Sequence, residues 1–193
     1  MRFVHHIKGG KELDRAKAIR AVEDLLDALG EDRSREGLRD TPRRVADMYA
    51  QLLSGVGKTA EEELSKTFAV EGGDMVIEKD IAFSSMCEHH LMPFFGRIAI
   101  AYIPGDRVVG LSKLARCVDI CAARLQLQER LTRQIAEEIM RCLSPVGVMV
   151  WCEAEHTCMT CRGVKKPGSK TVSYVTLGDF PEDKKAEVLA LVK

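Results

Sequence analysis

Apolar residues recur at helical spacing through the first third of the chain. Between residues 12 and 29 they predict an amphipathic helix, and they fall at Ile19, Val22, Leu26 and Leu29. Gly30 is a residue type suited to ending it. A second helix is predicted to begin at Thr41-Pro42, since threonine caps helix starts and proline fits the first turn. Its buried stripe is predicted to comprise Val45, Met48, Tyr49 and Leu52. We therefore expect residues 1–72 to form an N-terminal helical segment.

The spacing changes to that of strands after Gly72-Gly73. Alternating apolar positions predict one strand that runs into Cys87 and another over residues 95–103. Two helices follow, the first capped by Ser112 and the second over about residues 126–143. Two more strands are predicted, over residues 148–156 and 171–177, and then a short helix from Pro181.

This order of elements predicts an α+β fold for residues 73–193. Two strands, two helices and two strands give an antiparallel four-stranded sheet with two helices on one face. A sheet of four strands has two open edges, which a neighbouring copy of the chain can cover. We therefore expect a homo-oligomer.

Composition excludes several classes of partner. The 29 basic residues balance the 29 acidic ones, so no overall field favours nucleic acid or a membrane surface. No apolar run approaches the ~18 residues of a membrane span. Seven cysteines, an odd number, without a secretory leader indicate a reducing compartment, and we expect the cytoplasm. The adjacent His5 and His6 lie near the terminus, and we assign them no metal role.

Two short stretches concentrate cysteine and histidine. Residues 87–90 read Cys-Glu-His-His, and residues 156–161 read His-Thr-Cys-Met-Thr-Cys. Thiolates and imidazoles are the ligands that zinc prefers. One interpretation is a closed structural site with four ligands, which would be Cys87, His90, Cys158 and Cys161. A second is an open catalytic site with three of these ligands, in which His89 and His156 remain for proton transfer. A redox Cys-x-x-Cys pair is a third.

Nearby basic residues favour the open site. Such side chains are usually solvated, but Lys113 follows Ser112 at a predicted helix start, where free N–H groups attract phosphate. Arg162 directly follows the second cluster, and a guanidinium pairs with phosphate in bidentate fashion. A structural staple needs no such cations, whereas a polyanionic substrate does. Gln128-Glu129 is either a solvated helix start or a recognition pair, because a carboxylate can accept two N–H donors from guanine.

Several longer strings carry a family resemblance. They are Cys87-Glu88-His89-His90, residues 101–104, residues 110–116, residues 126–132 and residues 162–164, with residues 37–46 upstream. Together they resemble GTP cyclohydrolase I, in order, over roughly residues 15 to 180. The resemblance implies the tunnelling fold and a toroidal homodecamer with active sites at subunit boundaries. It also implies a zinc enzyme that converts GTP and water to 7,8-dihydroneopterin triphosphate and formate, the first step towards pterins and folate.

The resemblance also implies a role for particular residues. The zinc ligands would be Cys87, His90 and Cys158, and the active-site histidines His89 and His156. The substrate-binding residues would be Lys113, Arg116, Arg162 and Arg44 for phosphate, Ser112 and Gln128 for the nucleotide pocket, and Glu129 for guanine. Cys161 departs from the family, which has no ligand there, and we expect its thiol to point away. The alternatives are a non-catalytic zinc-stapled module and a related tunnelling-fold pterin or deazapurine enzyme.

Overall fold

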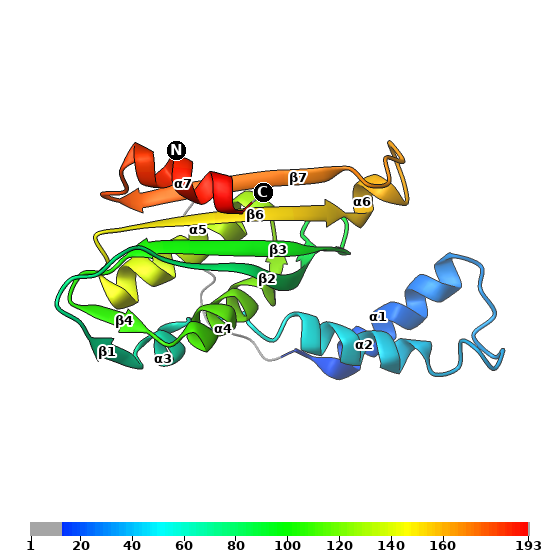
Figure 1. The fold of residues 1–193 in the computed structure, drawn as a ribbon. Coiled ribbons are helices and arrows are strands. Elements are labelled where there is room, and N and C mark those ends of the chain that lie inside the picture. Colours follow the sequence, from blue (N-terminus) through cyan, green and yellow to red (C-terminus); the bar gives the residue numbers. More distant parts are fainter. Residues whose placement is uncertain (1–12, 193) are drawn as a thin grey trace. The chain divides into compact units, whose positions relative to one another are not determined.

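The computed structural model describes residues 13–192, so His5 and His6 lie outside the described part of the chain. The chain packs as two compact units, Met1–Gly57 and Lys58–Lys193. Figure 1 identifies their helices and strands. The stretch from Lys58 to Gly72, grouped above with the N-terminal helices, packs with the second unit, because Ala60 and Leu64 belong to its core.

The N-terminal unit contains the two predicted helices, α1 (Arg15–Ala28) and α2 (Thr41–Leu52). An ion pair between Arg15 and Asp47, 2.6 Å long, joins them. Gly30 follows α1 with a φ of +77°, which confirms the predicted end. The predicted cap of α2 is wrong by one residue, because the carbonyl of Asp40 already accepts a hydrogen bond from the Arg44 amide.

Burial in the two N-terminal helices is slight. No residue of α1 is buried, and in α2 only Pro42 and Ala46 are buried. The predicted buried stripe is therefore wrong at Met48, which is 42% exposed. Helix spacing gives the apolar face of a helix but not what covers that face.

The second unit is built on a five-stranded sheet with the strand order β5-β2-β3-β6-β7. The long strands, each antiparallel to the next, are β2 (Val76–Cys87), β3 (Met92–Ile103), β6 (Gly147–His156) and β7 (Lys170–Gly178). They confirm the predicted α+β class. The count of four is corrected, because β5 (Leu125–Gln126) pairs in parallel with the end of β2. A separate two-stranded sheet joins β1 (Thr67–Ala69) and β4 (Arg107–Val109).

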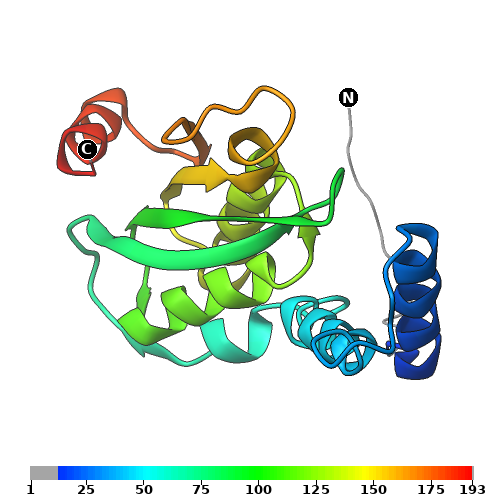
Figure 2. The same ribbon diagram turned by 90° about the vertical axis from the view of Figure 1, so that its right-hand side faces the viewer.

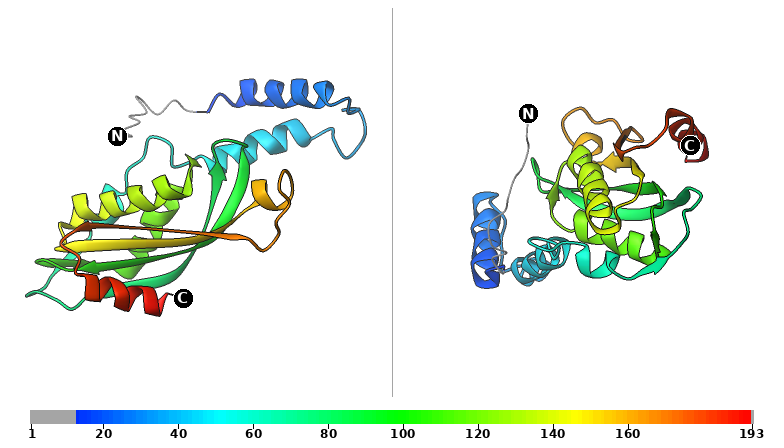
Figure 3. Two further views of the ribbon diagram at one scale, coloured as in Figure 1. Left: turned by 90° about the horizontal axis from the view of Figure 1, so that it is seen from above. Right: turned by 90° about the vertical axis from the view of Figure 1, so that its left-hand side faces the viewer.

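Helices α4 (Leu111–Ala122) and α5 (Gln128–Leu143) lie on one face of this sheet, as predicted. The short α3 (Glu61–Leu64) adds Leu64 to the same core. On the other face α7 (Glu182–Leu191) packs against Trp151 and Met149 through Val188. Figures 2 and 3 show α7 on the opposite side of the strands from α4 and α5. Strand β6 is thus covered on both faces, which explains its continuous apolar sequence.

The start of α4 differs from the prediction. Its N-cap is Gly110, and Ser112 lies inside the first turn. The Lys113 amide donates to the Gly110 carbonyl over 2.8 Å, so the helix is already under way at Ser112. Ser112 is therefore exposed on the first turn and caps nothing.

The pairing of β3 with β6 depends on Gly96. A Cβ atom at this position would lie 1.9 Å from the backbone oxygen of Glu153 and 2.7 Å from the Cα atom of Ala154. The two backbones therefore approach too closely for any other residue. This contact lies in the same ladder that pairs Phe94 with His156.

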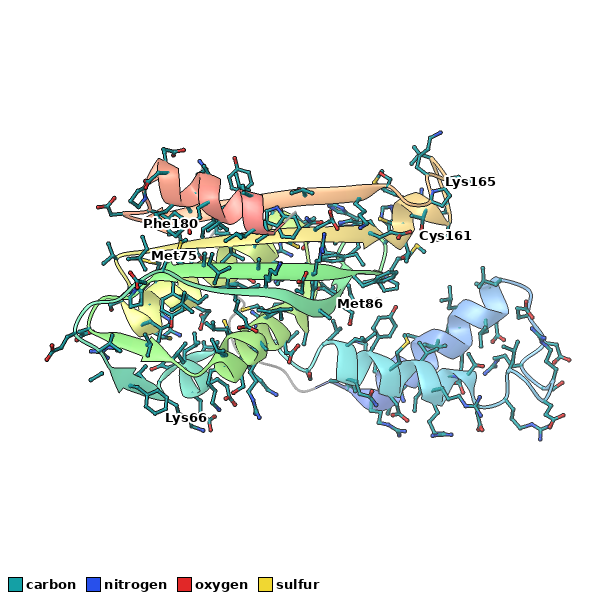
Figure 4. All side chains as sticks on the ribbon, viewed as in Figure 1. Lys66, Met75, Met86, Cys161, Lys165 and Phe180 are labelled. Carbon is teal, nitrogen blue, oxygen red and sulfur yellow. The ribbon has the colours of Figure 1, made fainter. Side chains whose placement is uncertain are left out.

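Different residues lie at the two ends of the sheet. Met86, Cys161 and Lys165 lie at one end, whereas Met75 and Phe180 lie at the other, beside α7 (Figure 4).

Within residues 13–192, no helix combines the length and the apolar character required to cross a bilayer.

Candidate active site

The first cysteine- and histidine-rich stretch forms a tight turn at the end of β2. The carbonyl of Cys87 accepts hydrogen bonds from the amides of His90, at 3.4 Å, and Leu91, at 2.9 Å. Leu91 has a φ of +52°, a left-handed conformation that leucine rarely adopts. The turn therefore folds Cys87 and His90 onto one side before β3 begins.

The second stretch reaches the same end of the sheet through β6. Register pairs Met92 with Cys87 and Phe94 with His156, so neighbouring strands bring the two stretches together. Beyond His156 the chain turns into α6 (Thr157–Thr160). The Thr157 hydroxyl donates to the Pro93 carbonyl over 2.6 Å and fixes α6 to the start of β3.

Cys87, His90 and Cys158 form a cluster of metal-ligand type. Their ligand atoms all lie within 4.8 Å of one another. Cys87 Sγ and His90 Nδ1 are 3.7 Å apart. Tetrahedral zinc, with a Zn–S bond of about 2.3 Å and a Zn–N bond of about 2.0 Å, places such atoms about 3.6 Å apart. The donor set therefore fits zinc in both chemistry and spacing.

The electrostatics of the cluster favour a cation. Burial raises the pKa of the Cys158 thiol, and the neighbouring Cys87 raises it further, while the positive charge of Arg162 opposes both. The Cys158 thiol therefore resists ionisation in this position beside Cys87. A divalent cation between them reverses this balance and holds both as thiolates.

Cys161 lies apart from this cluster. Its thiol is exposed and donates to the Thr157 carbonyl over 2.8 Å. The group of potential ligands found in residues 13–192 contains Cys87, His90 and Cys158 but not Cys161. Three protein donors are typical of catalytic zinc sites, whereas structural sites have four.

A pocket of about 170 Å³ opens beside the cluster. Both predicted histidines, His89 and His156, line it, together with the predicted recognition pair Gln128-Glu129. The remaining lining residues are Cys87, His90, Gln126, Leu127, Cys158, Met159 and Thr171. The pocket therefore combines potential metal ligands, imidazoles and a carboxylate.

Gln128 holds His156 in one orientation. The Gln128 side chain is 2% exposed, and its Nε2 donates to the carbonyls of Cys152 (3.2 Å) and Thr171 (3.0 Å) and to Ser173 Oγ (3.1 Å). Its Oε1 is therefore an acceptor, and it lies 2.8 Å from His156 Nε2. That nitrogen must carry the proton, which leaves Nδ1 of the neutral ring with a free lone pair.

Two further neighbours act on His156. The Phe94 ring stacks on the imidazole, with 4.6 Å between ring centroids. Burial lowers the pKa of His156, and the carboxylate of Glu129 opposes this shift. A lowered pKa keeps the ring neutral at physiological pH.

Two predicted phosphate-binding residues, Lys113 and Arg116, and the predicted nucleotide-pocket residue Ser112 are not part of this pocket in the single chain. Lys113 and Arg116 pair with Glu63 on α3, at 2.7 and 3.5 Å, and Ser112 lies beside them on the first turn of α4. The other end of α4 faces β2, where Ser85 Oγ donates to the Ala122 carbonyl. At 1.5 Å per residue, Lys113 and Ala122 are about 14 Å apart along the helix.

The two remaining predicted phosphate-binding residues, Arg162 and Arg44, lie in different units of the chain. Arg162 directly follows Cys161, and its charge lowers the pKa of Cys158, so it lies close to the cluster. Arg44 is on α2 in the N-terminal unit, where its guanidinium is 3.6 Å from the Asp40 carboxylate.

Residues with no role in the sequence analysis also shape the site. Glu88 and Arg130 form an ion pair between the ligand turn and α5, and Phe94 supports His156. Both partners of the ion pair belong to strings that carried the family resemblance, which was the available signal. Their pairing was not foreseen because 42 positions separate them.

Comparisons with known proteins agree with this geometry. A family model described as GTP cyclohydrolase I matches residues 18–193. GTP cyclohydrolase 1 of Clostridium perfringens (strain 13 / Type A) is 57% identical over 171 residues, covering 89% of this chain and 92% of the relative. GTP cyclohydrolase 1 of Bacillus subtilis (strain 168) is 53% identical over 186 residues, covering 95% and 98%. The protein of that name from Streptococcus sanguinis (strain SK36) is 52% identical over 172 residues, covering 89% and 94%.

A crystal structure of the archaeosine synthase QueF-Like in the apo form also matches. It has a TM-score of 0.45 and 20% sequence identity, and the match covers 56% of this chain and 98% of that chain. The family model and the curated relatives both extend over nearly the whole sequence. The chain belongs to the GTP cyclohydrolase I family.

Proposed function

We propose that this enzyme converts GTP and water to 7,8-dihydroneopterin triphosphate and formate, with zinc bound by Cys87, His90 and Cys158. GTP cyclohydrolase activity follows from membership of the family. The observation that carries the finer proposal is the three-donor cluster, because it opens on a pocket that also holds an oriented neutral imidazole and a carboxylate. A zinc ion there supplies Lewis acidity, which makes water nucleophilic near neutral pH.

The pocket can orient guanine beside the metal cluster. The exposed carboxylate of Glu129, on the first turn of α5, offers two oxygens to the N1–H and 2-amino donors of the base. Arg162, close to Cys158, offers a guanidinium to the triphosphate. Binding at both ends of the nucleotide positions C8 between them, so remote binding energy serves orientation.

The histidines supply proton transfer in this proposal. Hydration of C8 requires a proton at N7 of guanine, and later steps move protons near the ribose. His156 has its Nε2–H held by Gln128, so its Nδ1 is the nitrogen that accepts and returns a proton. His89 is exposed at the same pocket and serves as a second proton-transfer group.

The remaining substrate contacts are proposed to come from a neighbouring subunit. Ser112, Lys113 and Arg116 lie in the first two turns of α4, and none of them lines the pocket of its own chain. The edge strand β7 pairs only with β6 among the described residues, which suits pairing with another copy. A homo-oligomer with shared sites is therefore proposed, and ten subunits, a phosphate role for Arg44 and a cytoplasmic location stay predictions.

Two alternatives are less well supported. A closed zinc staple requires Cys161 as a fourth ligand, but that thiol instead donates to Thr157. A pterin or deazapurine enzyme of another family sharing this fold does not account for the match to GTP cyclohydrolase I over residues 18–193.

The proposal is tested by incubating the zinc-loaded protein with GTP. We expect stoichiometric release of formate together with the ultraviolet absorbance of a dihydropterin. Removing the metal with a chelator should abolish both signals, and adding zinc back should restore them, because no other described group supplies Lewis acidity. Absence of formate from metal-replete protein would contradict the proposal.

Replacing Gln128 with leucine should mainly reduce turnover. Without the acceptor Oε1, the His156 ring loses the contact that fixes its tautomer. We expect kcat to fall by about 100-fold, the lower end of a general acid–base contribution, with the zinc content unchanged. Steady-state kinetics and metal analysis measure both quantities.

Ser173→Ala is the matched control for Gln128→Leu, since it removes only one of the three acceptors of Gln128 Nε2. It should leave kcat within a few-fold of the parent value. Equal kcat values for Gln128→Leu and the parent enzyme would exclude a role for this hydrogen bond in proton transfer.

A further inference from the structure

We infer that Arg130 and Glu88 are positioning residues, which hold the metal-ligand turn against the start of α5. Neither residue lines the pocket, yet each is adjacent to residues that do. Glu88 follows the ligand Cys87, and Arg130 follows Glu129. The inference rests on the proposed function of the cluster as a zinc site and of α5 as the guanine-binding element.

The Arg130 guanidinium connects three segments. Its Nη2 donates to the Glu88 carboxylate and, over 3.0 Å, to the Leu125 carbonyl of β5. Its Nε donates to Gln126 Oε1 over 2.9 Å. A planar guanidinium with several fixed donors can hold such acceptors at once, whereas an ammonium group cannot reproduce that geometry.

Gln126 extends this contact into the interior. Its side chain is completely buried, and its Nε2 donates to the Cys121 carbonyl of α4 (2.9 Å) and to Gln134 Oε1 of α5 (2.8 Å). Arg130 is therefore anchored through Gln126 to both helices that cover the sheet. A buried network in which every polar group has a hydrogen-bond partner is rigid, so it can hold Arg130 in a fixed position.

The backbone makes the same connection. Strand β5 pairs with the last residues of β2, with Gln126 opposite Cys87. The Glu88 amide donates to the Gln126 carbonyl over 3.1 Å. The main chain of Glu88 is thus fixed to the segment that leads into Gln128 and Glu129, and its side chain is fixed to Arg130, directly after them. This arrangement sets the distance between the metal ligands and the guanine-binding carboxylate.

The turn has a reason to need this support. Leu91 holds a left-handed conformation, with a φ of +52°, which is disfavoured for a branched side chain. When the Glu88 carboxylate is released, the turn can relax, and His90 and Cys87 lose their common orientation. The ligand set is then less preorganised for the ion, and metal affinity falls.

The test compares Arg130→Ala and Glu88→Gln with the parent zinc enzyme. We expect the zinc dissociation constant, measured by competition with a chromogenic chelator, to rise by about 10- to 100-fold in Arg130→Ala. Glu88→Gln keeps the shape of the side chain and should show the same direction with a smaller rise. The visible spectrum of the cobalt-substituted protein should change in Arg130→Ala, because it reports the ligand geometry directly.

Arg141→Ala is the matched control. Arg141 is also on α5 and pairs with Glu138 (2.8 Å) and Glu61 (2.9 Å), but it lies near the other end of the helix, about 16 Å beyond Arg130 at 1.5 Å per residue. It should leave the zinc dissociation constant and the cobalt spectrum unchanged. Arg130→Lys should recover only part of the affinity, since lysine cannot bond all three acceptors.

Unchanged zinc affinity and cobalt spectrum in both Arg130→Ala and Glu88→Gln would overturn the inference, including the case in which only the melting temperature falls. Failure of the proposed function is distinguishable, because it would appear in the parent enzyme as zinc-loaded protein that releases no formate. The positioning role is tested separately, by the difference in zinc dissociation constant between each variant and the parent.

Discussion

Cys158→Ser is expected to lose zinc and turnover together. The hydroxyl of serine is not ionised at neutral pH, so the cluster would retain only Cys87 and His90 as effective donors. We expect the purified variant to contain little zinc and formate release from GTP to fall by more than about 10³-fold, because a zinc ion would no longer be held there to lower the pKa of a water molecule. Metal analysis and a formate assay measure the two effects.

Cys161→Ser provides a closely matched control. It makes the same chemical change three positions later, at a thiol that contacts the Thr157 carbonyl and not the cluster. Zinc content and turnover should match those of the parent. If Cys161→Ser lost zinc as completely as Cys158→Ser, the three-ligand assignment would be wrong and the closed structural site would regain support.

Gly96→Ala is expected to be the most damaging small substitution in the sheet. Its Cβ would meet the Glu153 oxygen at 1.9 Å, and backbone atoms cannot move aside as a side-chain end can. Overpacking of well-packed interiors costs about 1–3 kcal/mol and more when the backbone must shift. We expect a loss of at least about 3 kcal/mol in the free energy of unfolding, measured by urea denaturation, or insoluble expression.

Gly37→Ala is the control for Gly96→Ala. A Cβ at Gly37 would have no atom within 4 Å. The same addition of one methyl group should therefore leave the free energy of unfolding within about 1 kcal/mol of the parent value. Alanine can even stabilise the protein, because it reduces the conformational entropy of the unfolded chain. Equal stability of Gly96→Ala and the parent would contradict the described register of β3 and β6.

The long elements of the second unit could be predicted because their apolar patterns are long. Strands β2, β3 and β6 and helices α4 and α5 each bury several residues, and β7 alternates exposed with half-buried positions over most of its length. Strand β5, with two residues, is too short to show any period, and its pairing depends on the end of β2. Cap positions shifted by a residue or two because suitable polar residues stand side by side, as at Asp40 and Thr41.

The candidate site was predictable to the extent that its signals are local. Cys87 and His90 are three positions apart, so their spacing alone indicated a metal pair. The hydrogen bond from His156 to Gln128 joins residues 28 positions apart, and no local pattern encodes it. The distance of Lys113 from the pocket was also not apparent. The sequence shows that Lys113 is near the start of a helix, but it does not show which end of that helix lies near the pocket.

The separation of the two halves of the proposed ligand set has a consequence for when the protein could bind zinc. Cys87 and His90 leave the ribosome some seventy residues before Cys158. A nascent chain that ends between them offers one thiol and one imidazole, too few donors to retain zinc tightly. Binding of the proposed zinc ion would therefore follow the emergence of β6 and α6, when four of the five strands of the main sheet have been synthesised.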